Sequence, residues 1–158
     1  MTRETCIQDR GAAATHSRRV MTSSKELTWA TPQAWFDYLD LEFDFTLDPC
    51  LTHETAKCCK HFTPAENGLA QSWAEETVFM KPPYGKEVGL WMKKAYEEAR
   101  DNLALVVCFV RASVDTEWWR RYTARATEIR FPKGRVTFAG TETAAPFPVA
   151  IVIFRPRL

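Results

Sequence analysis

The apolar run over residues 103–110 constrains the fold of this chain most, because it contains no charged side chain and no break. A continuous apolar run of this length is typical of a parallel strand that is covered on both faces. Ahead of it, apolar residues recur at helical spacing over residues 86–102, and Thr77–Met80 is a shorter apolar run. Strand, helix and strand make a βαβ unit, which predicts an α/β fold with a mostly parallel sheet.

The chain before this unit predicts one helix and one strand. Thr31 is a good N-cap and Pro32 is a favoured first helical residue, so we expect a helix to begin here and to end near Asp40. The alternation of residues 43–47 predicts a strand that ends at Asp48. A carboxylate therefore projects from the carboxyl end of that strand.

The chain after the βαβ unit predicts a helix over residues 115–124 and then three strands. The strands are expected at residues 128–131, 135–138 and 149–154, and the turn Pro132-Lys133-Gly134 joins the first two as a hairpin. A tight hairpin and a returning strand imply that the mostly parallel sheet becomes antiparallel near its C-terminal end.

The length of 158 residues corresponds to about one domain. Residues 1–26 are polar and lack apolar periodicity, which predicts a flexible tail, and residues 27–158 are expected to form a single domain. No run approaches the roughly 20 apolar residues of a membrane helix, and the N-terminus has no apolar segment of a signal peptide. These absences predict a cytoplasmic protein without membrane contact.

Charge is distributed unevenly although the net charge is only +1. From Arg111 onward the chain has nine Lys and Arg residues against four Asp and Glu residues. This basic C-terminal third could supply contacts to phosphate groups. The alternative is that these side chains are ordinary solvated surface.

The segment Lys81-Pro82-Pro83-Tyr84 ends the strand predicted at Thr77–Met80. Two consecutive prolines have no N–H groups to continue a ladder, so the strand stops here and Tyr84 lies on the exit loop. Ligands of open α/β sheets bind outside the carboxyl ends of the strands, where an aromatic ring could stack on a flat substrate. The alternative is a plain turn that ends a strand.

A group of metal-ligand residue types also lies in the first half of the chain. Its members are Cys50, His53, Cys58, Cys59 and His61. These are common zinc ligands, but the adjacent cysteines and the missing second pair do not match the usual spacing. We therefore expect no metal site.

In combination these features resemble the small phage-type Dam family of DNA adenine N6-methyltransferases, which use S-adenosyl-L-methionine (AdoMet). The matching landmarks occur in order along the chain: Trp29, Thr31 and Pro32; Leu47 and Asp48; Ala56, Lys57 and Cys58; Gly68, Leu69 and Trp73; Pro82, Pro83 and Tyr84; Trp91; Arg111; residues 128–131; and Gly134, Arg135 and Phe138. The resemblance implies a Rossmann-like AdoMet-dependent methyltransferase fold, with a mostly parallel sheet, antiparallel C-terminal strands and no separate target-recognition domain.

The resemblance also implies a chemistry for the Pro-Pro-Tyr segment. The amino group of adenine is a poor nucleophile, so the family accepts hydrogen bonds from its N–H groups while the base is flipped out of double-stranded DNA. By resemblance, Tyr84 stacks on the adenine, the Pro82 carbonyl accepts one N–H, and Lys81 and Pro83 complete the catalytic segment.

Two further residue sets follow from the resemblance and from the charge distribution. The residues expected around AdoMet are Trp29, Thr31, Pro32, Asp48, Pro49, Cys50 and Glu66, of which Glu66 is the candidate ribose-binding carboxylate. The residues expected to contact DNA are Arg111, Arg130, Lys133 and Arg135, each with a structural or surface role as the alternative.

Lys81 departs from the family pattern, which has Asn or Asp before Pro-Pro. An ammonium has three donors and no acceptor, and bringing a side chain of pKa ~10.4 to neutrality near pH 7.4 costs about 4 kcal/mol. The cation also opposes the positive charge of the methyl-transfer transition state. The sequence therefore predicts severely weakened or absent methyl transfer with the fold intact.

Two classes of function remain open at this point. One is a phage DNA adenine methyltransferase in the host cytoplasm, which protects phage DNA from restriction or mimics host marks. The other is a catalytically inactive protein with the methyltransferase fold that binds DNA, AdoMet or a host protein.

Overall fold

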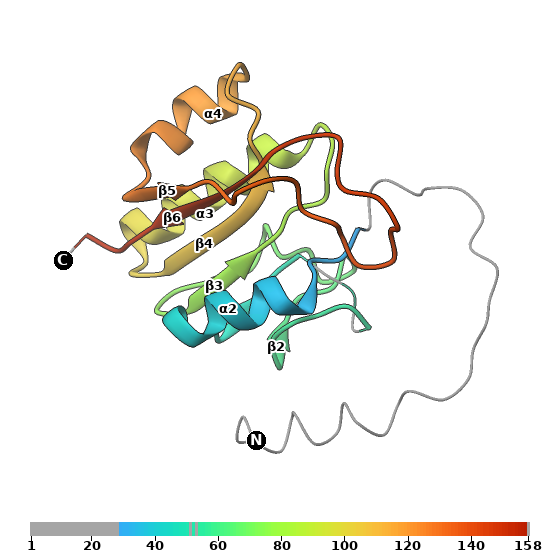
Figure 1. The fold of residues 1–158 in the computed structure, drawn as a ribbon. Coiled ribbons are helices and arrows are strands. Elements are labelled where there is room, and N and C mark those ends of the chain that lie inside the picture. The colour runs from blue at the N-terminus through green and yellow to red at the C-terminus, as the bar shows by residue number, and fades with distance from the viewer. Residues whose placement is uncertain (1–28, 51, 53, 158) are drawn as a thin grey trace.

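The computed structural model describes residues 29–50, 52 and 54–157, and the tail predicted for residues 1–26 lies outside them. The elements in chain order are α2 (Gln33–Phe43), β1 (Leu47–Asp48), β2 (Lys60–His61), β3 (Thr77–Met80), α3 (Val88–Asp101), β4 (Leu105–Arg111), α4 (Glu117–Arg121), the 3-10 helix η1 (Thr123–Arg125), β5 (Glu128–Arg130) and β6 (Val149–Phe154) (Figure 1).

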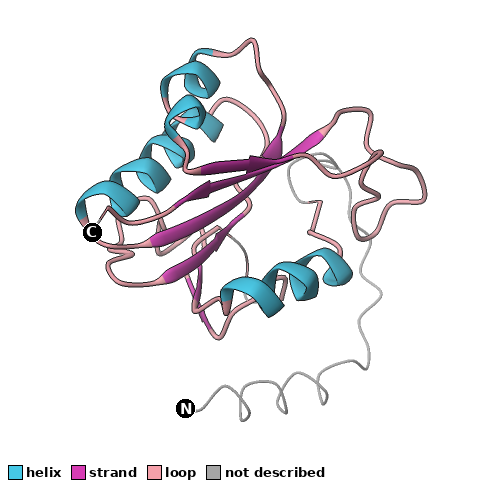
Figure 2. Cartoon of the chain, turned by 60° about the vertical axis from the view of Figure 1, so that its left-hand side comes forward, coloured by secondary structure: helices cyan, strands magenta, loops and turns pink. Residues whose placement is uncertain are grey.

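A six-stranded sheet in the order β2-β1-β3-β4-β6-β5 forms the centre of the molecule. The strands β2, β1, β3 and β4 pair in parallel, whereas β6 is antiparallel to both β4 and β5. Helix α2 covers one face of the sheet, and α3 and α4 lie on the other (Figure 2). This is the predicted α/β fold, a mostly parallel sheet with antiparallel C-terminal strands of the methyltransferase type.

The central strands bury side chains on both faces, which explains their uninterrupted apolar sequences. In β4, Val106 and Cys108 belong to the core cluster under α3, and Val107 and Phe109 belong to the cluster under α2. In β3, Phe79 faces α2 and is fully buried. Each strand therefore needs apolar residues at consecutive positions rather than at alternate ones.

The predicted boundary between the first helix and the first strand is wrong. Helix α2 continues to Phe43 because Phe36, Leu39 and Phe43 form one buried stripe at helical spacing. Asp44 then adopts a left-handed conformation with φ of 57° and ends the helix. Only Leu47–Asp48 pairs as a strand, so the alternation of residues 43–47 belongs to a helix end and a connection.

The predicted N-cap of this helix is also wrong. The helix begins at Gln33 after Pro32, and no side chain caps it. The Thr31 hydroxyl is buried and has no hydrogen-bond partner among the described residues.

The predicted hairpin does not form, because residues 135–138 are not a strand. Strand β5 pairs with β6 instead, in the register Arg130↔Ile151. Val136 and Phe138 are nevertheless buried in the core under α2. The alternating sequence of this segment therefore reflects the packing of a loop rather than a ladder.

The backbone at Gly68 lies very close to Pro49, the residue that follows β1, and substitution of Gly68 tests this close approach. A Cβ atom at this position would lie 2.1 Å from the Pro49 carbonyl oxygen, whereas one at Gly134 would meet nothing within 4 Å. We expect Gly68→Ala to lower the free energy of unfolding by about 1–3 kcal/mol through overpacking.

Gly134→Ala is the matched control, because it carries only the strain of a φ of +76° and should cost about 1 kcal/mol. Urea unfolding of both variants compares the two costs. A Gly68→Ala variant that is no less stable than the Gly134→Ala variant would contradict the close approach.

Candidate functional site

The carboxyl ends of three parallel strands meet at one edge of the sheet and bring the main predicted residues together. Asp48 ends β1, Lys81 follows β3 and Arg111 ends β4. The register pairs Leu47 with Val78 and Met80 with Cys108, so these strand ends are neighbours. The predicted site therefore lies at the edge where open α/β sheets bind their ligands.

Lys81 is buried in the centre of this site, with 1% of its surface exposed. Its Nζ atom donates a hydrogen bond to the Trp29 carbonyl oxygen. The same atom lies 4.8 Å from the centre of the Tyr84 ring and 5.7 Å from that of Phe138. The ammonium thus replaces water with one carbonyl dipole and two aromatic faces.

This environment changes the charge of Lys81. Burial lowers its pKa from the ordinary value of 10.5 to about 8, and the negative charges of Cys50 and Asp48, where ionised, oppose that change. At neutral pH the side chain is mostly protonated, but neutrality is accessible. The cost of removing the proton is therefore much lower than for an exposed lysine.

Asp48 is fully buried beside Lys81, and its carboxylate holds the chain that follows β1. Its Oδ2 atom accepts a hydrogen bond of 2.9 Å from the Lys57 backbone N–H, and Oδ1 accepts one of 3.4 Å from the Cys50 N–H. Burial raises the pKa of Asp48 to about 6, and these two bonds limit the rise. Asp48 thus fixes the backbone of the segment after β1 through these hydrogen bonds.

Four aromatic rings close the site on the side of the long loop between β5 and β6. Tyr84 packs edge-on against Phe147 at 5.3 Å and against Phe138 at 6.0 Å, and Trp29 lies 5.5 Å from Phe138. The Tyr84 hydroxyl is buried without a hydrogen-bond partner among the described residues. An unpaired buried hydroxyl is costly unless a ligand meets it.

Arg111 lies at the rim of this aromatic group. Its guanidinium is 4.9 Å from the centre of the Phe147 ring. Burial raises the pKa of Tyr84, and the positive charge of Arg111 partly offsets that rise. The side chain is exposed at the end of a buried strand. The predicted DNA contact at Arg111 thus lies beside the Pro-Pro-Tyr segment, although its role stays a prediction.

Two other predicted residues already have partners. Glu66 is exposed, and its carboxylate accepts hydrogen bonds from the Thr63 N–H at 2.8 Å and the Thr63 hydroxyl at 2.9 Å. Arg130 forms ion pairs with Glu42 and Glu128, both at 2.6 Å, and so links α2 to β5. This favours the structural alternative for Arg130.

The remaining basic residues predicted to contact DNA lie on the loop after β5. Lys133 and Arg135 are exposed there, and neither has a carboxylate within 4.0 Å among the described residues. Both are free to meet a phosphate, and this role stays a prediction.

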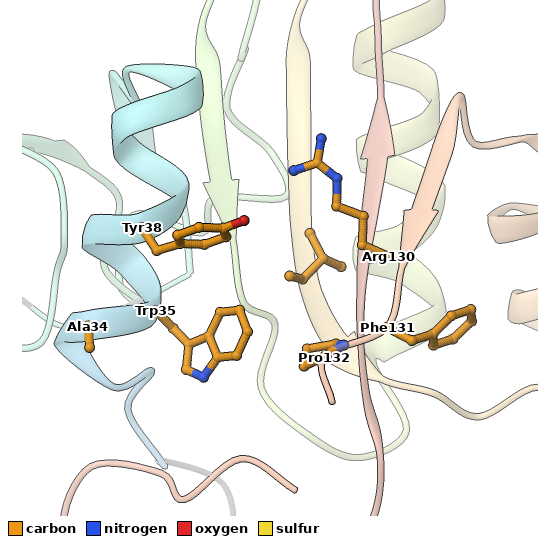
Figure 3. Close-up of a pocket in the computed structure, with 7 residues that line it drawn as sticks. Ala34, Trp35, Tyr38, Arg130, Phe131 and Pro132 are labelled. Carbon is orange, nitrogen blue, oxygen red and sulfur yellow. The ribbon is translucent and has the colours of Figure 1, made fainter. Parts of the chain in front are cut away.

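A mostly apolar groove of about 380 Å³ lies between α2 and the strands β5 and β6 (Figure 3). The residues that line it are Ala34, Trp35, Tyr38, Arg130, Phe131, Pro132 and Ile151. Trp35 and Tyr38 of α2 thus leave part of an aromatic helix face open to solvent. Among the predicted site residues only Arg130 borders this groove.

Two contacts of the site were not predicted from the sequence: the hydrogen bond of Lys81 to the Trp29 carbonyl and the packing of Phe147 on Tyr84. A backbone carbonyl carries no residue-type signal, and Phe147 reaches Tyr84 through the conformation of a loop.

Neither a metal cluster nor a membrane span occurs in the described part of the chain. No group of three or more His, Cys, Asp or Glu side chains there could hold a metal ion, and His53 of the proposed zinc set lies outside that part. No helix in it is long and apolar enough to cross a membrane.

Comparison with known families gives a match over most of the chain. The sequence profile described as DNA N-6-adenine-methyltransferase (Dam) matches residues 18–154. A search of curated proteins gives no match. The matched range includes every strand and helix described above.

The burial of Lys81 predicts a pH dependence of stability. A folded-state pKa of about 8 against an unfolded value near 10.5 means that the unfolded chain holds the proton more tightly. The penalty is fully present below pH 8 and is relieved as the pH rises toward 10.5. We expect the free energy of unfolding to rise over this window by roughly 3 kcal/mol relative to a Lys81→Met variant.

Chemical unfolding of both proteins between pH 7.5 and 10.5 measures this difference, and other titrating groups largely cancel in it. Parallel stability curves for the two proteins would show that Lys81 keeps an ordinary pKa.

Proposed function

The chain belongs to the DNA N-6-adenine-methyltransferase (Dam) family, and we propose that its site binds AdoMet and a flipped adenine but transfers the methyl group only weakly. The observation that carries this proposal is the buried ammonium of Lys81 between the Trp29 carbonyl and the Tyr84 ring. In the proposed reaction a phage-type enzyme modifies double-stranded DNA in the host cytoplasm.

The end of β1 suits a polar cofactor. Thr31 and Tyr84 each present a buried hydroxyl without a protein partner among the described residues, and Asp48 orders the chain at Pro49 and Cys50. AdoMet, when bound, supplies an electrophilic methyl group on a sulfonium. We infer that Thr31 and the segment after β1 hold this cofactor, with Trp29 and Pro32 beside it.

The base pocket is proposed at Tyr84. Its ring would stack on adenine, and the Pro82 carbonyl would accept one N–H of the amino group. The ring of Pro83 fixes its φ angle, which reduces the freedom of the backbone between the Pro82 carbonyl and the Tyr84 ring. The Lys81 ammonium already lies over the Tyr84 ring, so the base and the lysine must share this space.

The buried position of Lys81 changes the energetic estimate made for an ordinary lysine. With a pKa of about 8, the neutral amine at pH 7.4 costs about 0.8 kcal/mol rather than about 4 kcal/mol. The neutral amine has a lone pair that can accept a hydrogen bond from adenine. The protonated form has none, and its charge opposes the transition state.

A second function is favoured by the same observation. A lysine that donates to Trp29 at the position of the catalytic acceptor suits a protein that retains the fold and binds DNA or AdoMet without turnover. Calorimetric titration with AdoMet helps to distinguish the two functions. A chain that does not bind AdoMet cannot transfer its methyl group, so only binding of DNA or of a protein would remain.

Replacement of Lys81 by the family's residue gives the main test. We expect Lys81→Asn to raise methyl transfer by roughly 10²- to 10³-fold, because it restores a hydrogen-bond acceptor and removes the cation. The measurement is incorporation of labelled methyl groups into unmethylated duplex DNA. The control is Lys86→Asn, which makes the same change at an exposed position on the same loop.

Equal activity of the unaltered chain and the Lys81→Asn variant would contradict the proposed weakening. If neither protein methylates DNA while both bind AdoMet, the second function is the better description.

The residual activity should also depend on pH. Deprotonation of Lys81 supplies the acceptor, so the rate of the unaltered chain should increase about tenfold from pH 7 and level off above pH 8 to 9. The Lys81→Asn variant should show no such step. Single-turnover rates across this range provide the comparison. Identical pH profiles for the two proteins would show that the rate does not depend on deprotonation of Lys81.

A further inference from the structure

A second groove, of about 440 Å³, lies on the opposite side of the molecule from the candidate site. Four arginines border it, together with Tyr96 and Thr127: Arg100, Arg125, Arg155 and Arg157. They come from the end of α3, from η1 and from the segment after β6. None of the four was predicted to contact DNA.

The topology explains why this groove is remote from the Pro-Pro-Tyr segment. Strand β6 runs antiparallel to β4, and Phe154 at its end pairs with Val106 near the start of β4. The end of β6 therefore lies at the opposite edge of the sheet from Lys81 and Arg111. Figure 1 shows β6 beside β4 and the C-terminus beyond it.

The positive charge of the groove is only partly neutralised. Arg100 pairs with Asp101 at 2.6 Å, and Arg155 lies 3.9 Å from Glu128. Arg125 and Arg157 have no carboxylate within 4.0 Å in the described part of the chain. The groove thus retains two guanidinium groups that no described carboxylate pairs with.

The ring of Tyr96 contacts two of these arginines. The guanidinium groups of Arg100 and Arg125 lie 5.3 Å and 5.7 Å from the centre of the Tyr96 ring. A hydrogen bond from Arg100, with the nearby charge of Arg125, lowers the pKa of Tyr96. Stacked guanidinium groups have fewer conformations and are better placed to bind an anion.

We propose that this groove binds phosphate groups of the DNA backbone, at a position separate from the base pocket. Planar guanidinium groups bind phosphate oxygens in pairs, and such contacts need no base sequence. The inference rests on the proposed function only in that DNA is the substrate. It requires neither AdoMet nor methyl transfer.

The test uses a labelled duplex that contains only G·C pairs, so that the adenine pocket does not contribute. The double variant Arg125→Gln and Arg157→Gln removes the two unpaired charges. The matched control, Arg120→Gln and Arg121→Gln, removes two exposed charges on α4 outside the groove. Both variants therefore have the same net charge.

Binding is measured by fluorescence anisotropy between 50 and 300 mM NaCl. Each lost phosphate contact should reduce the slope of log K against log salt by about 0.9, so the groove variant should lose one to two units of slope. At 100 mM salt its affinity should fall roughly tenfold or more, whereas the control should stay within about twofold of the unaltered chain.

Equal losses in the two variants would overturn the proposal, because net charge alone would then explain them, and so would unchanged binding by the groove variant. Titration with sodium pyrophosphate completes the experiment. Pyrophosphate binding that depends on Arg125 and Arg157, without any change in duplex affinity, would identify a site for small anions and overturn the DNA assignment.

These results are distinguishable from a failure of the proposed methyltransferase function. An inactive chain that still loses duplex affinity through Arg125 and Arg157 supports the groove and contradicts only the turnover. A chain that does not bind the duplex at all would overturn both.

Discussion

The parallel pairing of β1, β3 and β4 is the constraint on which the site depends. Hydrogen bonding between parallel strands aligns their carboxyl ends, so Asp48, Lys81 and Arg111 arrive at one edge although long stretches of chain separate them. Such pairing is stable only when both faces of the sheet are covered, here by α2 on one side and by α3 and α4 on the other. The apolar content of β3 and β4 and the location of the site therefore have one cause.

Lys81 is a charged side chain buried among apolar residues, and its burial costs free energy. Burial shifts its pKa by an amount that corresponds to a penalty of roughly 3 kcal/mol, while a hydrogen bond from a charged group returns about 1.5–3 kcal/mol. The contact with the Tyr84 ring adds a smaller gain. The pKa of about 8 already includes these gains, so a net penalty remains at neutral pH, and stability alone gives no reason for a lysine at this position rather than an apolar residue.

The parts of the fold that were predicted correctly are those in which local pattern and tertiary environment agree. The βαβ unit around α3 is of this kind, because its helix is amphipathic and its strands are buried on both faces. The alternation of residues 43–47 satisfies a strand pattern and also continues the apolar stripe of α2. Burial of Phe43 in one stripe with Phe36 and Leu39 decided in favour of the helix, and the local alternation does not reveal that burial.

The candidate site was predictable to a similar degree. Strand ends are visible in sequence as prolines and carboxylates, and so Asp48 and the Pro-Pro-Tyr segment were found. The loop between β5 and β6 was not predictable, because its residues pack on the core without a ladder, and Phe147 reaches the site only through that packing. The ion pair of Arg130 with Glu42 joins residues 88 positions apart, and a charge pattern cannot reveal such a partner.

The position of β6 has a consequence for how the chain acquires its fold during synthesis. This strand comes last among the described elements, yet it lies inside the sheet between β4 and β5. Until it is added, β4 has an open edge and β5 has no partner, so the earlier strands cannot close the sheet. The sheet therefore cannot be completed in the order in which its strands are made, and it closes only after β6 has been synthesised.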